Sequence, residues 1–334
     1  MTIDFNELCN SHWDTEQWND IYKNIYINTD KVLNYGIKEL CKNPNLTINF
    51  KIDTEEKYFK KDEINAFAKI CDEENYSIVL SKKLIQLLSH FSRKIIDYEF
   101  IFSHIKRVEE NRQILMELAD FAFYIWIQSI FFHEFAHIVR GHLATNYRKS
   151  RIKTWYEISN YEVNKKLKKE YIKSLEADAD KWGSTFMLGN AYLILEEMFK
   201  KHYKNQNEED YLYDYILTIV LMYDLFERLE HKVREEFNES DFDHPHPEYR
   251  ALISLLILGE DHLQNKVFTS IDSQKKMSIV MKAIQTYFLE FRQFSNTRYS
   301  KQMLGWVNFI NKTRKILEKH KINKKTLFKK KDIV

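Results

Sequence analysis

The segment that most constrains the fold runs from Asn111 to about His142 and has no glycine or proline before Gly141. Its middle part, Phe121–Phe132 (FAFYIWIQSIFF), is apolar on nearly every face of a helix, which is typical of a helix buried inside a protein. Directly after it comes His133-Glu134-Phe135-Ala136-His137, an HExxH pattern. The sequence therefore predicts a long buried helix whose last turns carry two histidines and a glutamate.

The HExxH pattern predicts a metal site. Residues four apart lie on the same face of a helix, so His133 and His137 can bind one Zn²⁺ through their imidazoles. Glu134 can take a proton from a zinc-bound water. The alternative is a surface helix with two exposed histidines and an incidental glutamate. The apolar turns before the pattern favour a buried site, where unpartnered polar groups would be costly and a metal would satisfy them.

A catalytic zinc has three protein ligands and one open position, so a third ligand must come from elsewhere. The best candidate is Glu176, in Glu176-Ala177-Asp178-Ala179-Asp180. Asp180 lies one turn further along the same face and could accept the ring N–H of a ligand histidine, which would fix that ring. The alternative for this segment is a solvated acidic patch near a helix start.

Two glycines lie close to these faces. Gly183 and Gly141 would let two helices approach closely enough for both to reach one ion. Gly141 has a second interpretation, in which it simply ends its helix.

A histidine-bearing segment follows at His244-Pro245-His246-Pro247, ending in Arg250. The prolines leave its backbone little freedom. We therefore count His244, His246 and Arg250 as candidate catalytic residues that contact the substrate or transition state. The segment is also compatible with a helix entrance. A further hypothesis is that His244 or His246 occupies the fourth zinc position and holds the site inactive until a trigger arrives.

The fold expected is mainly α, an α+β arrangement with long helices and a small β-sheet beside the HExxH helix. Six glycines and three prolines in 334 residues favour long helices. Strands are predicted at Asn45–Asp53 and Tyr76–Ser81. The other helices are predicted at Lys83–Ile96, Ser174–Phe199 with Ser174 as N-cap, Tyr211–Leu229, Ala251–Gly259 and Lys276–Phe294. The polar stretch Thr145–Lys173 is expected to be an excursion between the two helices of the site.

Three regions are expected: an N-terminal helical segment (1–44), a core (45–260) and a C-terminal helical segment with a basic tail (261–334). The net charge of +2 and the three cysteines, Cys9, Cys41 and Cys71, suit a reducing cytoplasm and dictate no polyanionic partner. The start of the chain has no signal-peptide core, and the apolar runs are shorter than the roughly 20 residues of a membrane span. No membrane span is therefore expected.

Taken in order, several motifs resemble those of gluzincin peptidases, in particular the HtpX-like peptidases. These motifs are Asn65-Ala66-Phe67-Ala68, the strand Tyr76–Ser81, HExxHxxxGH at 133–142, ExxAD at 176–180, and HPxxxxR at 244–250. The layout is also similar to that of the cytoplasmic Lit-type phage-exclusion peptidases.

The resemblance implies a zincin-like core and zinc-dependent endopeptidase activity on a protein or peptide, with a role in phage defence and a regulatory trigger. It implies His133, His137 and Glu176 as ligands, Glu134 as base and Asp180 as orienting residue. Because zincins often bind substrate as an added strand, Tyr76–Ser81 is expected to form the sheet edge. Two rival functions are a nucleic-acid-associated effector using the basic tail and a pseudo-peptidase with a structural zinc. Such tails are more often solvated termini, so nucleic acid is not the expected partner.

Overall fold

A computed structural model describes the greater part of the chain and bears out a mainly helical fold with a small sheet. The residues described are 20–27, 29, 46–61, 63–72, 75–103, 112–144, 154–156, 169–202, 208–236, 250–251, 268, 270–292, 305, 308, 311–312, 315–316 and 318–319. The predicted helix at Ala251–Gly259 lies almost entirely outside these residues, as does most of the basic tail.

The sheet has four described strands in the order β1-β3-β2-β4. They are β1 (Thr47–Asp53), β2 (Ala66–Ile70), β3 (Asn75–Ser81) and β4 (Thr154–Tyr156). β1 and β3 are parallel, whereas β2 is antiparallel to both β3 and β4. The two strands predicted from sequence are confirmed as β1 and β3. The other two were not predicted, and β4 lies inside the stretch expected to be a polar excursion.

The expectation that Tyr76–Ser81 forms the sheet edge is wrong, because β3 lies between β1 and β2. The strand is buried on both faces. Its residues Ile78 and Leu80 belong to the main core, whereas Val79 packs on the other face with Phe59 and Phe67. Its backbone pairs with β1 on one side and with β2 on the other, so neither side is open to an added strand. Among the described strands, β1 and β4 are the two at the edges.

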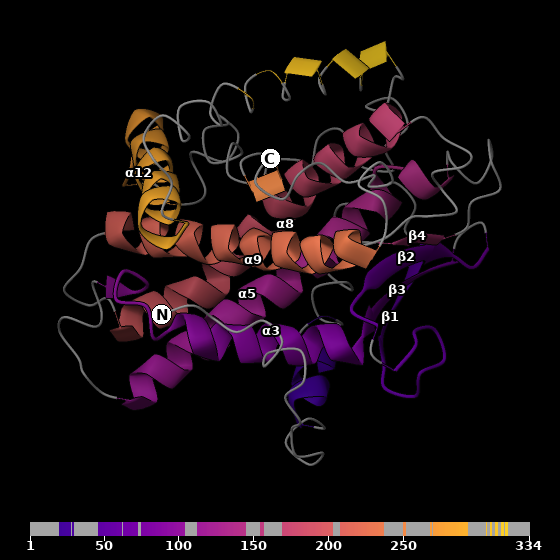
Figure 1. Cartoon of the computed structure of the whole chain (residues 1–334), viewed down its shortest axis with the longest axis horizontal. Coiled ribbons are helices and arrows are strands. Elements are labelled where there is room, and N and C mark those ends of the chain that lie inside the picture. Colours follow the sequence, from indigo (N-terminus) through magenta and orange to yellow (C-terminus); the bar gives the residue numbers. More distant parts are fainter. Residues whose placement is uncertain are drawn as a thin grey trace.

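The helix α5 (Arg112–Val139) is the centre of the molecule (Figure 1). It packs against α3 (Lys82–Ile95), α8 (Lys169–His202), α9 (Glu208–Glu236) and the sheet. The alanines at positions 66 and 68 of β2 belong to the core that includes α5, and their small side chains let the helix lie close to the sheet. The predicted buried helix is thus confirmed, and it delivers the HExxH turn to the interior.

The ends of the helices follow local capping rules. Ser81 is the last residue of β3 and also the N-cap of α3, where its Oγ accepts a hydrogen bond from the Leu84 N–H at 3.1 Å. The prediction of Ser174 as an N-cap is wrong. The structure describes α8 from Lys169, and the Ser174 hydroxyl donates to the Glu170 carbonyl at 2.7 Å inside the helix.

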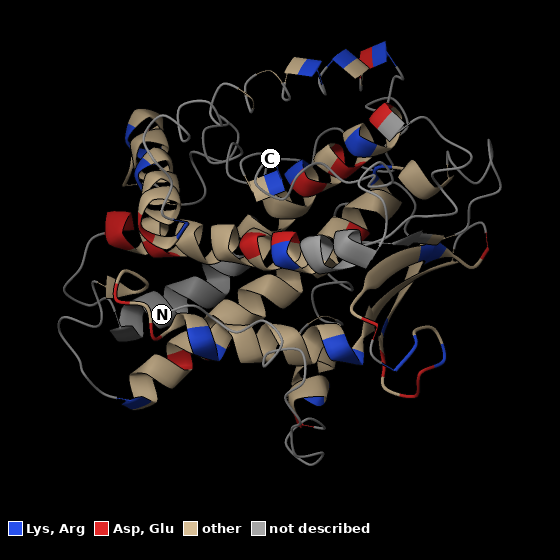
Figure 2. Cartoon of the chain, viewed as in Figure 1, with Lys and Arg blue, Asp and Glu red and all other residues tan. Residues whose placement is uncertain are grey.

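The C-terminal helix prediction is confirmed for α12 (Ser273–Thr286), which Asp272 caps through the Lys275 N–H. The helix widens into a π-helix, η3 (Tyr287–Phe291), at its end. In Figure 2 the acidic first turn of α9 is red beside α12, and Glu209 in this turn pairs with Lys275 at 3.0 Å.

Parts of the two terminal regions join the same hydrophobic core. Tyr22 and Ile25 from the N-terminal side and Val280 and Ala283 from α12 belong to the cluster that contains α5. In addition, the Tyr26 hydroxyl accepts a hydrogen bond from the Ile52 N–H of β1 at 2.6 Å. One core therefore draws on all three of the regions expected from sequence.

By length and composition alone, α5 is long and apolar enough to cross a membrane. Its most apolar run, Phe121–Phe132, is shorter than the roughly 20 residues of a membrane span. In the structure most of this helix is buried among α3, α8, α9 and the sheet, which is the arrangement of a core helix.

Candidate metal centre

The two HExxH histidines lie side by side at the end of α5. His133 and His137 are both buried, and their Nε2 atoms are 3.0 Å apart. Their rings meet at 71° with centroids 4.7 Å apart. Two imidazole nitrogens therefore converge on one point in the interior, as the i, i+4 spacing predicted.

Glu176 of α8 joins them. Its Oε2 lies 3.2 Å from the His133 Nε2 and 3.7 Å from the His137 Nε2. In a tetrahedral zinc site with bonds of about 2.0–2.1 Å, neighbouring ligand atoms are separated by roughly 3.3 Å. The three observed separations bracket this value. His133, His137 and Glu176 thus form a buried group that could hold a metal ion.

Close contact between the two helices makes this convergence possible. Gly183 of α8 lies so near α5 that a Cβ at this position would be 2.8 Å from the His133 nitrogen and 2.9 Å from its Cα. The interpretation of Gly183 as a close-approach residue is therefore supported. Gly141 has a φ of 75° just after the end of α5, which supports its role in ending that helix.

The Nδ1 side of His133 is fixed from behind by an aspartate–arginine pair. The Asp180 Oδ1 lies 2.9 Å from Nδ1, and Arg250 contacts both oxygens of the same carboxylate at 2.9–3.2 Å. The Tyr223 hydroxyl also reaches Asp180, at 3.3 Å. Burial alone would raise the pKa of Asp180, but Arg250 and His133 lower it below its usual value. Asp180 occupies the place predicted for it.

Arg250 was expected to face the substrate on the metal side of His133, but it lies on the opposite side of that ring. Its Nη2 is 3.4 Å from the Nδ1 of His133, whereas Nε2 is the nitrogen that faces Glu176. The guanidinium also stacks over Tyr223, 5.4 Å from the ring centroid. This arrangement suits a residue that holds Asp180 and His133 in place. The other two residues predicted from the same segment, His244 and His246, lie outside the described residues.

A second set of buried residues holds His137, and sequence reasoning missed it. The His142 Nδ1 lies 3.1 Å from the His137 Nδ1, and the His142 Nε2 lies 2.9 Å from Asp178 Oδ2. Arg140 binds both oxygens of Asp178, at 2.8 and 3.1 Å, and stacks over Trp182. The signal available in the sequence was the alternation of acids in the ExxAD segment, which supplies one carboxylate for each histidine.

The protonation states in this second set follow from burial and charge. Burial lowers the pKa of His137 to about 3 and also lowers the pKa of His142, so both rings are neutral near pH 7. Burial alone would raise the pKa of Asp178, but His142 and Arg140 outweigh it and lower the pKa to about 2. Asp178 is therefore a carboxylate that accepts hydrogen bonds.

Four carboxylates and two guanidiniums are buried in or beside this group among the described residues. Two buried guanidiniums, Arg140 and Arg250, offset two of its buried carboxylates. The four carboxylates are Glu134, Glu176, Asp178 and Asp180. Counted over these six described residues alone, with every carboxylate ionised, the formal sum is −2, and a divalent cation would offset it. Glu134 follows His133 in the same helical turn of α5, and its side chain is fully buried.

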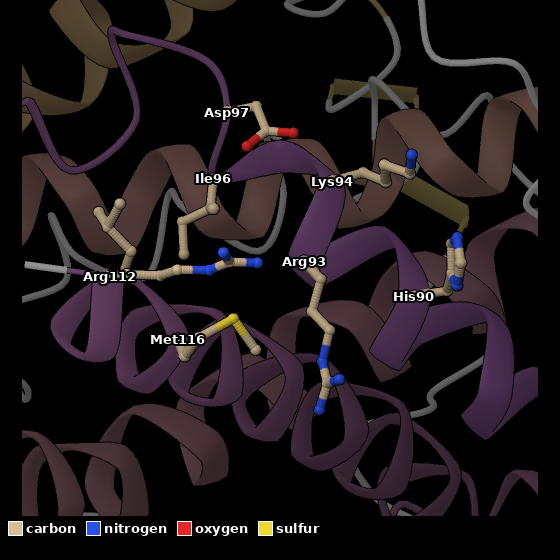
Figure 3. A pocket seen from close by; sticks show the side chains of 8 residues that line it. His90, Arg93, Lys94, Ile96, Asp97, Arg112 and Met116 are labelled. Carbon is tan, nitrogen blue, oxygen red and sulfur yellow. The ribbon is translucent and has the colours of Figure 1, made fainter. Parts of the chain in front are cut away.

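A separate cavity of about 650 Å³ lies between α3 and the start of α5 (Figure 3). Its lining combines apolar and charged side chains, namely His90, Arg93, Lys94, Ile96, Asp97, Arg112, Leu115 and Met116. Met116 and His133 are 17 residues apart on one helix, so the cavity is about 25 Å from the metal ligands. The cavity is therefore not part of the metal centre.

Comparison with known proteins found no match to any family model, to any curated protein or to any solved structure.

Proposed function

We propose that this protein is a zinc-dependent endopeptidase of the gluzincin type. The observation that carries the proposal is the convergence of His133, His137 and Glu176 at near-tetrahedral separations, with Glu134 buried next to His133. Two imidazoles and one carboxylate form a ligand set used by catalytic zinc in hydrolases. The excess of buried carboxylates over guanidiniums among these described residues also favours a divalent cation.

The chain's own residues would carry the proton transfers. When bound, zinc would lower the pKa of a coordinated water towards about 7 and polarise the scissile carbonyl. Glu134 would take the proton of that water and deliver it to the leaving amine. Asp180 and Arg250 would keep the His133 ring in the orientation that ligation needs.

The substrate would be a protein or peptide bound as an extra strand. Because β3 lies inside the sheet, we place the peptide beside β4, which is at an edge of the sheet among the described strands and pairs with β2. The main chain of β4 has β2 as its neighbour on one side. An extended peptide could pair with its other side through backbone hydrogen bonds.

The cellular role that we propose rests on resemblance to the Lit-type peptidases. It is an abortive-infection protease of the cytoplasm that waits for a trigger. The burial of the metal group fits an enzyme that is kept closed until activated. The same burial also favours a second candidate, a structural metal in a protein that is not a peptidase, because structural zinc sites are closed.

One experiment separates these two candidates. Purified protein is loaded with Zn²⁺ and mixed with fluorescent unfolded casein and with a peptide library, in parallel with Glu134→Gln. We expect about one zinc per chain in both proteins and cleavage by the wild type, at least ~10²-fold slower in the variant. The assay is repeated in mild denaturant, which would open a closed site, and zinc binding without cleavage of either probe under both conditions would favour the structural metal. Equal cleavage by both proteins would rule out Glu134 as the base.

A further inference from the structure

His142 returns to the metal centre because the chain turns sharply after α5. Gly141, with its φ of 75°, adopts a left-handed conformation that side-chain-bearing residues rarely take. The His142 ring then lies against the ring of His137, with centroids 5.1 Å apart and planes at 73°. Both rings are buried, so the contact between their Nδ1 atoms, at 3.1 Å, is shielded from water.

The hydrogen-bond chain through these rings has one consistent direction. Arg140 donates to both oxygens of Asp178, which is the geometry of a carboxylate, so Asp178 accepts and the Nε2 of His142 donates to it. The buried His142 ring shares this carboxylate with Arg140, and a second buried positive charge there would be costly. The ring therefore carries one proton, and its Nδ1 must accept. The partner at this atom is the Nδ1 of His137, which therefore donates. The lone pair of His137 is left on Nε2, the atom that faces Glu176 and His133.

We propose that His142 and Asp178 are positioning residues that select the metal-binding tautomer of His137. This inference rests on the proposed metal site. The direction of the hydrogen-bond chain, however, is set by His142 and Asp178, which are not among the proposed ligands. Arg140 anchors the far end, because it binds both oxygens of Asp178. Each ligand histidine thus has its own carboxylate–arginine pair, Asp180 with Arg250 for His133 and Asp178 with Arg140 for His137.

The two carboxylate–arginine pairs differ in how they reach their histidines. Asp180 touches His133 directly, whereas Asp178 acts on His137 through the intervening ring of His142. Both carboxylates come from α8, two residues apart, so their side chains leave the helix in different directions. Docking of the single segment 176–180 onto α5 therefore supplies one ligand and the partners that orient both histidines.

The test uses the full-length protein and two substitutions at position 142. Phenylalanine fills the space but removes the acceptor for His137. Glutamine carries an acceptor oxygen and donor N–H groups on one planar amide, so it can serve both His137 and Asp178. We expect His142→Phe to bind Zn²⁺ 10- to 100-fold more weakly in competition with a chromophoric chelator. His142→Gln should recover most of that loss.

A matched control is His90→Phe, the same change on α3, at the cavity beside the start of α5 and outside the metal centre. It should leave zinc affinity unchanged, whatever its effect on thermal stability. If His142→Phe acted only through a general loss of packing, His142→Phe and His90→Phe would both be less stable than the wild type. Their zinc affinities would then be similar.

A second readout needs neither metal nor substrate. Imidazole ¹⁵N shifts of the metal-free wild type should show the proton of His137 on Nδ1, and His142→Phe should show a mixture of tautomers. The proposal is overturned if the wild type carries the His137 proton on Nε2, or if folded His142→Phe keeps full zinc affinity. Failure to cleave any peptide would instead count against the proposed function and leave the tautomer result standing.

Discussion

Gly183 and His133 are in direct backbone contact, since a Cβ on residue 183 would lie 2.8 Å from the His133 nitrogen. This contact fixes the separation of α5 and α8 at the level of the metal ligands. The distance between His133 and Glu176 therefore depends on a position that has no side chain.

Gly183→Ala should destabilise the protein by about 1–3 kcal/mol, because the added methyl group must push the two helices apart. An alanine for glycine in an open helix would instead stabilise it by up to about 1 kcal/mol. Zinc affinity should fall as well, because Glu176 moves with α8. Chemical denaturation and chelator competition would measure both effects. Ser184→Ala, one residue along and half-buried, is the control and should change neither quantity much.

Removal of metal should expose the repulsion among the buried carboxylates. We expect the metal-free protein to melt at a lower temperature, and Glu134→Gln to raise the stability of that form by removing one negative charge. The gap in melting temperature between metal-free and zinc-loaded protein should narrow in the variant. Calorimetry with and without chelator would measure it. The exposed Glu290→Gln should leave the gap unchanged, and an equally wide gap in Glu134→Gln would contradict the charge argument.

Arg250→Lys distinguishes a positioning role from direct contact with the reacting carbonyl. Lysine keeps the charge but cannot contact both oxygens of Asp180 through a planar fork. If Arg250 acts through Asp180 and His133, zinc affinity should drop by about 10-fold or more. If Arg250 were the oxyanion donor, kcat would fall at unchanged zinc affinity. Tyr223→Phe removes a 3.3 Å contact to the same carboxylate and should have a smaller effect.

Stability should fall at alkaline pH because several tyrosines are buried. Burial raises the pKa of Tyr22, Tyr215 and Tyr287, and the neighbouring Asp224 raises that of Tyr287 further. These groups stay protonated in the folded state while the unfolded chain ionises near pH 10. Their contribution is complete below pH 10 and is lost as pH rises above it. The part of the tyrosinate absorbance that comes from these buried groups should therefore appear only together with loss of helical circular dichroism. Early ionisation of all tyrosines in the folded protein would contradict this expectation.

The sequence predicted the local parts of the metal centre well. The spacing of His133 and His137 follows from helix geometry, and Glu176 and Asp180 follow from the same geometry on α8. Each of these predictions needed only the period of a helix and the chemistry of zinc ligands. The long buried helix could also be predicted from the sequence, because a helix that is apolar on all sides is stable only when it is buried.

The contacts of His142, the strand β4 and the start of α8 could not be predicted, because they depend on residues far apart in the sequence or on the surrounding fold. The approach of His142 to His137 requires the left-handed turn at Gly141, and its pairing with Asp178 joins residues 36 positions apart. β4 has three residues and exists through pairing with β2, so its own composition gave no signal. Ser174 has the composition of a cap, but the helix continues before it and its hydroxyl bonds back to Glu170.

The position of segment 176–180 in the chain also determines the order in which the residues of the metal centre are synthesised. The histidines of α5 leave the ribosome before the carboxylates that surround them, and Arg250 follows more than seventy residues after Glu176. A nascent chain that ends before α8 has two histidines and a glutamate but none of their acidic partners. A chain that ends before residue 250 still lacks the cation that holds Asp180. The complete centre is therefore a late product of translation, and shortened chains lack it.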